Sequence, residues 1–144
     1  MMARWHEANF PVCEEMNVAY VAFSPLANGI LSGKYTPDTK FEGSQDYRSG
    51  MPQYTKEGYA KAKGLLELLS RLAEEKHATM GQISLAWMLC KKPYIVPIPG
   101  SRKIERLKEN FGAGSIALSA AEVADIDAKL DTMSFDVFGG HTAK

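Results

Sequence analysis

The sequence is short of cysteine, of net charge and of long apolar runs, and each shortage excludes a class of protein. Cys13 and Cys90 are the only cysteines among 144 residues, too few for a disulfide framework or a structural zinc site. The 17 Lys and Arg residues balance 17 Asp and Glu residues, so no global field attracts nucleic acid or an anionic membrane. No apolar stretch approaches the roughly 20 residues of a membrane span. We therefore expect a cytoplasmic protein with reduced thiols, whose charged ligands must be held by local clusters.

Stretches with helical periodicity alternate with two short apolar runs. Residues Val18–Phe23 and Tyr94–Ile98 are apolar without alternation, which is typical of strands in a parallel sheet that is covered on both faces. Helices are predicted over Glu7–Met16, Lys56–His77, from Thr79 to before Pro93, from Ser101 to about Asn110, and from Ser119 to about Leu130. This order predicts an α/β fold in one domain, residues 1–144, with two parallel strands and flanking helices.

Local motifs mark where several of these elements begin and end. Thr79–Gln82 and Ser119–Glu122 match capping boxes, and Ser101 is predicted to cap the helix that follows it. Asn17 suits a left-handed residue at a helix end. The stretch Tyr35–Tyr54 mixes proline and glycine with charged residues and shows no clear periodicity, so an extended surface loop is predicted there.

Two interior strands alone make an incomplete sheet. A parallel pair that is buried on both faces requires further strands on its edges, because unpaired main-chain groups along a strand invite pairing with another chain. We therefore expect a fragment of a larger fold, or a chain that needs a partner, with self-association through the uncovered strand edges as one outcome.

A basic segment follows the second predicted strand. Arg102, Lys103 and Arg106 lie at the start of a predicted helix, where the helix dipole disfavours cations by about 0.3–1 kcal/mol each. An anion at this position would explain them, because main-chain amides after Gly100 and the guanidinium groups can bind a phosphate. The alternative is a solvated basic turn that is balanced by nearby glutamates at helical spacing.

A second candidate segment, SPLANGILSGK over Ser24–Lys34, follows the first predicted strand. Its small residues allow the main chain to approach a phosphate closely. Both candidate segments come at the carboxyl ends of parallel strands, which is the edge where α/β folds bind ligands, so we expect them to serve one ligand. His6, His77 and His141 are far apart and lack the spacing of metal ligands, so no metal site is predicted.

At these residues the chain resembles the aldo-keto reductases. Three blocks occur in the family's order: SPLANGILSGK, then ATMGQISLAWML, then IVPIPGSRKIERLKEN. The resemblance runs to about Leu130. It implies a (β/α)8 TIM barrel that uses NADPH to reduce aldehydes and ketones, of which this chain would supply the seventh and eighth strands with their helices. A small carbonyl compound is the substrate of the full-length family.

The resemblance also implies which residues contact the NADPH/NADP cofactor. Ser24 and Leu26 match positions at the pyrophosphate, and Asn28, Ser32 and Lys34 lie in the same loop. Ser101, Arg102 and Arg106 match the region that holds the adenosine 2′-phosphate, where Gly100 stands at a position that is a lysine in some members. Glu109 and Asn110 match the pair at the adenine. Arg106 is the strongest single candidate.

The family's four catalytic residues, a Tyr assisted by Lys, Asp and His, come from earlier barrel strands. No residue of this chain inherits a catalytic role, so the chain is expected to be a truncated aldo-keto reductase that does not reduce carbonyl compounds by itself. Two alternatives stay open. One is a non-catalytic nucleotide-binding or interaction module. The other is a longer gene whose internal methionine has been taken as the start.

Overall fold

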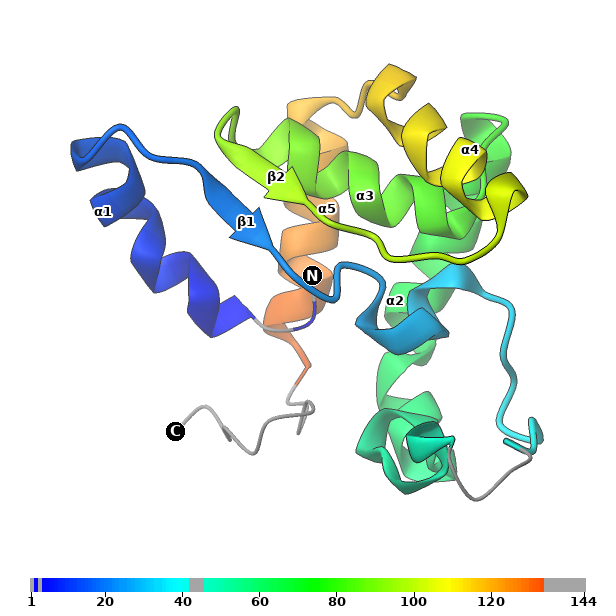
Figure 1. Ribbon diagram of the computed structural model, residues 1–144. Helices are drawn as coiled ribbons and strands as arrows, with labels where there is room; N and C mark the ends of the chain where they lie inside the picture. The colour runs from blue at the N-terminus through cyan, green and yellow to red at the C-terminus, as the bar shows by residue number, and fades with distance from the viewer. Residues whose placement is uncertain (1, 3, 42–45, 134–144) are drawn as a thin grey trace.

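The computed structural model describes residues 2, 4–41 and 46–133. Figure 1 shows two short strands beside a layer of helices. In chain order the described elements are the 3₁₀ segment η1 (Arg4–Asn9), α1 (Phe10–Glu15), β1 (Tyr20–Ala22), η2 (Ala27–Ser32), η3 (Tyr47–Gly50), η4 (Pro52–Tyr54), α2 (Lys56–Glu75), α3 (Met80–Lys91), β2 (Ile95–Pro97), α4 (Ile104–Gly112), η5 (Ala113–Ser115) and α5 (Ala120–Asp131).

The two strands pair in parallel, as the sequence predicts. Val21 of β1 lies opposite Val96 of β2, and hydrogen bonds from Tyr20 N to Tyr94 O and from Ile98 N to Ala22 O extend the pairing at both ends. β1 is shorter than the predicted strand. The strand cannot begin at Val18, because the Val18 amide donates a hydrogen bond to Cys13 O in α1. It ends before Ser24, whose left-handed φ of 49° is incompatible with a strand.

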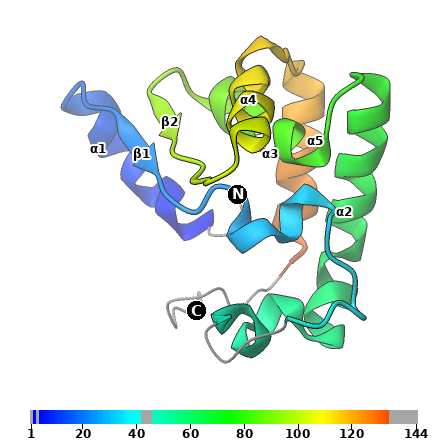
Figure 2. The same cartoon turned by 45° about the vertical axis from the view of Figure 1, so that its right-hand side comes forward.

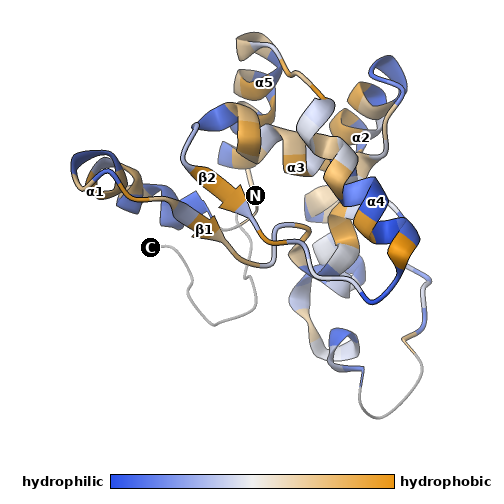
Figure 3. Cartoon of the chain, turned by 45° about the horizontal axis from the view of Figure 1, so that its top comes forward, coloured by the Kyte–Doolittle hydropathy of each residue, from blue (hydrophilic) through white to orange (hydrophobic). Residues whose placement is uncertain are grey.

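The prediction that both faces of the sheet are buried is wrong for this chain. Ile95 is buried against the helical layer, whereas Val21 and Val96 on the other face are 57% and 47% exposed. Figure 3 shows both strands in the hydrophobic colours. The described residues contain only one helical layer, so one apolar face has no cover.

The core lies among the helices. α2 places Leu65 and Leu69 against α3 and α5, which contribute Ile83 and Ile126, and all four side chains are fully buried. The apolar spacing of α2 produces this buried face, and the predicted helix there is confirmed. Both predicted capping boxes are present, at Thr79 for α3 and at Ser119 for α5. The helical core is therefore independent of the open face of the sheet.

Two predicted helix starts differ from the structure. The helix predicted from Glu7 is a 3₁₀ segment that becomes α-helical only at Phe10, beside Pro11, whose fixed φ suits the first turn of a helix. Ser101 does not cap α4. Its hydroxyl instead accepts a hydrogen bond from Lys103 N at 3.1 Å, a local turn that delays the helix to Ile104. Asn17, with a φ of 51°, is left-handed as predicted.

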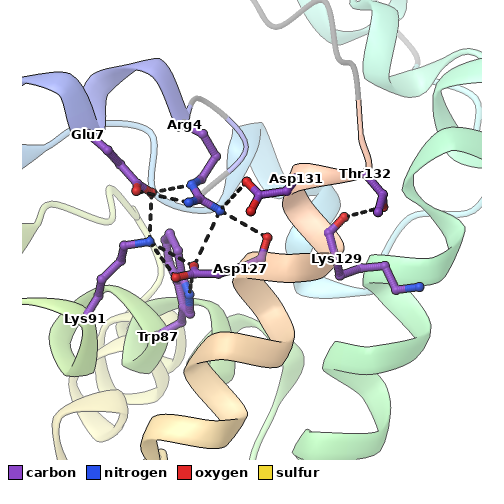
Figure 4. A network of polar contacts seen from close by, with 8 residues as sticks. All are labelled: Arg4, Glu7, Trp87, Lys91, Asp127, Lys129, Asp131 and Thr132. Atoms are coloured by element: carbon purple, nitrogen blue, oxygen red, sulfur yellow. Dashed lines mark hydrogen bonds and ion pairs between the residues drawn. The ribbon is translucent and has the colours of Figure 1, made fainter.

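A polar network fastens the first residues of the chain to the helical layer (Figure 4). Lys91 of α3 lies 2.9 Å from Glu7 of η1 and 2.9 Å from Asp127 of α5. The indole of Trp87 donates to the same Asp127 at 3.0 Å, and Arg4 pairs with Asp131 of α5 at 3.2 Å. Because the Lys91 side chain is only 10% exposed, its charge depends on these two carboxylates.

None of the helices in the described ranges is long and apolar enough to cross a membrane.

Candidate functional site

Two loops meet at the carboxyl ends of the strands and enclose a cleft of about 950 Å³. Figures 1 and 2 show the segment after β1, which leads into η2, running close to the segment after β2, which leads into α4. The structure brings every predicted cofactor residue to the lining of this cleft: Ser24, Leu26, Asn28, Ser32, Lys34, Gly100, Ser101, Arg102, Arg106, Glu109 and Asn110. Residues more than 70 positions apart in the sequence thus share one surface.

The first wall of the cleft is a tightly turned loop. Asn28 and Gly29 have φ values of 59° and 108°, the second of which suits glycine. The loop is held from outside because the hydroxyl of Tyr54 donates to the main-chain oxygen of Asn28 at 2.8 Å. Inside the loop, the Ser32 hydroxyl donates to Gly29 O at 2.6 Å, so Ser32 stabilises the turn. Lys34 is exposed at the end of the wall, with no carboxylate partner among the described residues.

The second wall is the turn after β2 and the first residues of α4. A Cβ at Gly100 would meet open space, so this position presents only main chain to the cleft. Arg102 and Lys103 are exposed and form no ion pair with any described residue. The cap position of α4, Lys103, supplies no side-chain acceptor, which leaves the amides of the first turn available. Unpaired cations and free amides at one helix end favour an anion there.

Further along α4, Arg106 and Glu109 form an ion pair inside the cleft. Arg106 donates to one carboxylate oxygen of Glu109 at 2.7 Å, and the other oxygen accepts from the hydroxyl of Thr79 at 2.8 Å. The Gln82 amide also donates to Glu109 O at 2.9 Å. Glu109 is therefore fixed on the start of α3 and in turn orients the Arg106 guanidinium, whose charge it partly neutralises.

A third wall comes from the long loop and was missed by reasoning from the sequence. Arg48 lines the cleft, donates to Tyr35 OH at 2.6 Å and to Asp46 Oδ1 at 2.8 Å, and lies 4.6 Å from the centre of the Phe41 ring. The hydrogen bonds from Arg48 lower the pKa of Asp46 and hold it ionised. The loop has no periodic pattern that would predict this cluster. The only signal in the sequence is that Arg48 lies two residues from Asp46 in a loop that contains aromatic residues.

The chemistry of the cleft is that of an anion site. Lys34, Arg48, Arg102, Lys103 and Arg106 surround it, against two carboxylates that are both engaged by arginines. Such a surface suits a ligand with several phosphate oxygens, since guanidinium groups bind phosphate through paired hydrogen bonds. Within the described ranges, no three His, Cys, Asp or Glu side chains are grouped so that they could hold a metal ion.

Comparison with known proteins gives a consistent result. A family model described as the aldo/keto reductase family matches residues 2–131. The aldo-keto reductase yakc of Schizosaccharomyces pombe, whose name includes NADP(+), is 40% identical over 120 residues, which cover 83% of this chain and 35% of that protein. The aldo-keto reductase str7 of Strobilurus tenacellus is 39% identical over 112 residues, which cover 78% of this chain and 33% of that protein. The chain spans about a third of the length of these relatives.

Solved structures agree with the family match. A glycerol dehydrogenase from Gluconobacter oxydans superposes with a TM-score of 0.72 at 26% identity, covering 92% of this chain and 40% of that one. A thermostable aldo-keto reductase solved with the inhibitor epalrestat gives a TM-score of 0.59 at 25% identity, covering 88% and 35% of the two chains. The parallel strands and their helices are the C-terminal part of an α/β TIM barrel. The chain belongs to the aldo/keto reductase family.

Proposed function

We propose that the cleft binds the phosphate and adenosine portions of NADPH/NADP. One observation supports this proposal. The eleven residues that the sequence predicts to bind the cofactor come from two separate segments, and all of them line one cleft of about 950 Å³. That volume lies at the upper end of the range for small-molecule sites, roughly 300–1,000 Å³. The presence of NADP(+) in the name of one relative supports the choice of ligand.

Each wall of the cleft would contact a different part of the nucleotide. The loop around Ser24 and Asn28 would take the pyrophosphate, with Lys34 supplying a positive charge at its rim. Arg102 and Lys103, which form no ion pair with a residue that the structure describes, would take the 2′-phosphate together with Arg106. The adenine would lie toward Glu109 and Asn110 of α4. A 2′-phosphate distinguishes NADPH from NADH, so these cations predict a preference for NADPH.

We further propose that the isolated chain binds the nucleotide without turnover. When bound in a complete enzyme, this cofactor supplies hydride to a carbonyl carbon and an aldehyde or ketone becomes an alcohol. Protonation of the carbonyl oxygen requires an acid, and the family's Tyr, Lys, Asp and His have no counterpart in this chain by resemblance. The chain's own residues would hold and orient the nucleotide, and the carbonyl substrate belongs to the full-length relatives. The reduced thiols and the nucleotide fit a cytoplasmic location.

The test is a calorimetric titration of the purified chain with NADPH and NADH, alongside circular dichroism and an aldehyde turnover assay. We expect saturable binding of NADPH by a helical chain, weaker binding of NADH, and no turnover. A folded chain that binds neither nucleotide would refute the assignment of the cleft. If the isolated chain reduced an aldehyde, the proposal that it has no catalytic acid would be wrong.

A second candidate function, that of a non-catalytic interaction module, is favoured by the uncovered apolar surface. Val21 and Val96 are exposed on the open face of the sheet, and on α4 the apolar residues Ile104, Leu107 and Phe111 are 66%, 47% and 89% exposed. Exposed apolar area of this kind marks interaction sites, and free strand edges can pair with a second copy of the chain. We therefore expect concentration-dependent self-association, measured by analytical ultracentrifugation.

The substitution Val21→Lys tests the open sheet face directly. A lysine at this exposed position should shift the chain toward the monomer, while Glu74→Lys, which adds a lysine on the exposed side of α2, serves as the control. A wild-type chain that sediments as a monomer at every concentration would exclude self-association through these edges.

A further inference from the structure

The turn in the first wall of the cleft specifies both residues of an Asn-Gly pair. Asn28 has a left-handed φ of 59°, which asparagine tolerates better than most residues. Gly29 has a φ of 108°, and a Cβ at this position would lie 2.9 Å from the ring of Tyr35, so the turn requires glycine. Of the four asparagines in the sequence, Asn28 alone precedes a glycine.

An asparagine that precedes a glycine loses its side-chain amide to water without an enzyme. The main-chain nitrogen of the glycine attacks the side-chain carbonyl carbon, its proton leaves with the amide group as ammonia, and a succinimide ring forms. Water then opens the ring at either carbonyl, which gives aspartate or isoaspartate. Glycine permits the attack best, because it has no side chain to shield its nitrogen. In this chain the reacting atoms are Gly29 N and Asn28 Cγ.

The contacts around Asn28 activate its side chain but hold the turn closed. Ser24 Oγ donates a long hydrogen bond to Asn28 Oδ1, at 3.4 Å, which draws electrons from the carbon that is attacked. The ψ of Asn28, 18°, turns Gly29 N away from the side chain, whereas the ring needs both on one side of the Cα–C bond. Gly29 N also donates to Leu26 O at 2.9 Å, and Tyr54 OH donates to Asn28 O at 2.8 Å. The reaction therefore requires the turn to open.

The turn has space in which to open. Asn28 lines both the charged cleft and a neighbouring cavity of about 120 Å³, so it borders free space on two sides. We propose that Asn28 deamidates spontaneously through the open state of this turn, and that the product places a carboxylate on the first wall of the cleft. The effect of that charge on a nucleotide rests on the proposed function, whereas the reaction itself does not.

The test follows the full chain by peptide mass mapping at mildly alkaline pH, both folded and denatured in guanidinium chloride. We expect Asn28 to convert in the folded chain, but more slowly than in the denatured chain. The other asparagines, Asn9, Asn17 and Asn110, are internal controls and should stay intact in the folded chain. Two results would overturn the proposal: an Asn28 that stays intact in the folded chain while the denatured chain converts completely, and equal rates in the two states.

Tyr54→Phe removes one restraint on the turn. It should speed the conversion of Asn28 in the folded chain about twofold to tenfold, the effect of one hydrogen bond, and leave the rate in the denatured chain unchanged. Tyr94→Phe is the control, because that hydroxyl donates to Glu14 and not to the turn. An unchanged rate in folded Tyr54→Phe would contradict control of the reaction by this bond. If Tyr54→Phe does not fold, the two states of the unaltered chain still decide the matter.

Asn28→Asp tests the consequence for the cleft. It should bind NADPH at least about fivefold more weakly than the unaltered chain, because two like charges about 4 Å apart repel by about 1 kcal/mol even in water. Asn17→Asp is the matched control, since Asn17 is also left-handed but does not line the cleft. Equal affinities of all three chains would refute this effect of the product. An unaltered chain that binds no NADPH would refute the proposed function, and the mass measurement would still decide the reaction at Asn28.

Discussion

Removal of the Arg106 guanidinium is the sharpest test of the 2′-phosphate assignment. A hydrogen bond to a charged group contributes about 1.5–3 kcal/mol, which corresponds to roughly a tenfold to hundredfold change in affinity. In the structure Arg106 is also bound to Glu109 at 2.7 Å, so a phosphate must share this guanidinium with a carboxylate. We therefore expect Arg106→Ala to weaken NADPH binding by about 1.5 kcal/mol, the lower end of that range.

The assay is calorimetric titration of wild type and variant with NADPH and NADH at two salt concentrations. Lys108→Ala is the matched control, because it removes one positive charge from the same helix at a residue that does not line the cleft. NADH binding should change much less than NADPH binding, and added salt should narrow the difference between wild type and variant. If Arg106→Ala and Lys108→Ala weakened NADPH binding equally, the effect would come from net charge alone. If Arg106→Ala weakened NADPH and NADH binding equally, Arg106 would not contact the 2′-phosphate.

Three further changes test the fold around the cleft. Asp127→Ala should lower the free energy of unfolding by about 2 kcal/mol in urea denaturation, because it leaves the buried ammonium of Lys91 with one carboxylate. Hydrogen bonds from Lys76 and from the main chain lower the pKa of Glu122 below its usual 4.5, so its stabilisation is complete above that pH and is lost as the pH falls through the lowered pKa. In Glu122→Gln the free energy of unfolding should therefore fall less steeply as the pH is lowered. An unchanged pH dependence would show that the Glu122 carboxylate does not cause this loss of stability. Tyr54→Phe should weaken NADPH binding about threefold, because it frees a main-chain carbonyl of the first cleft wall, and unchanged affinity would show that the loop holds its shape without this bond.

Reasoning from the sequence succeeded where the physical cause is local or periodic. The capping boxes at Thr79 and Ser119 need only residues within one turn, and both are present. The stripe of leucines along α2 specifies a buried face without reference to the rest of the chain. The parallel pairing of the strands followed from the order of elements, and the gathering of the cofactor candidates followed from the common edge of those strands.

It failed where the outcome depends on competition or on distant partners. Serine is a common helix cap, but the Ser101 hydroxyl accepts a hydrogen bond from Lys103 N two residues away and does not cap α4. The apolar runs around Val21 and Val96 predicted burial on both faces, and burial needs a cover that the described residues do not supply. Arg48 reaches Tyr35 across thirteen positions of irregular chain, and no pattern in the sequence encodes that contact.

The walls of the cleft follow the two strands directly and are also anchored in the helical layer. Glu109 is bound by Thr79 and Gln82 at the start of α3, and Gly33, with a φ of 69°, packs closely on Met80 of the same helix. The described helices share a core of fully buried side chains, whereas one face of the sheet is open. A chain that spans about a third of its relatives' length can therefore hold the walls of this cleft in place through contacts with its helical layer.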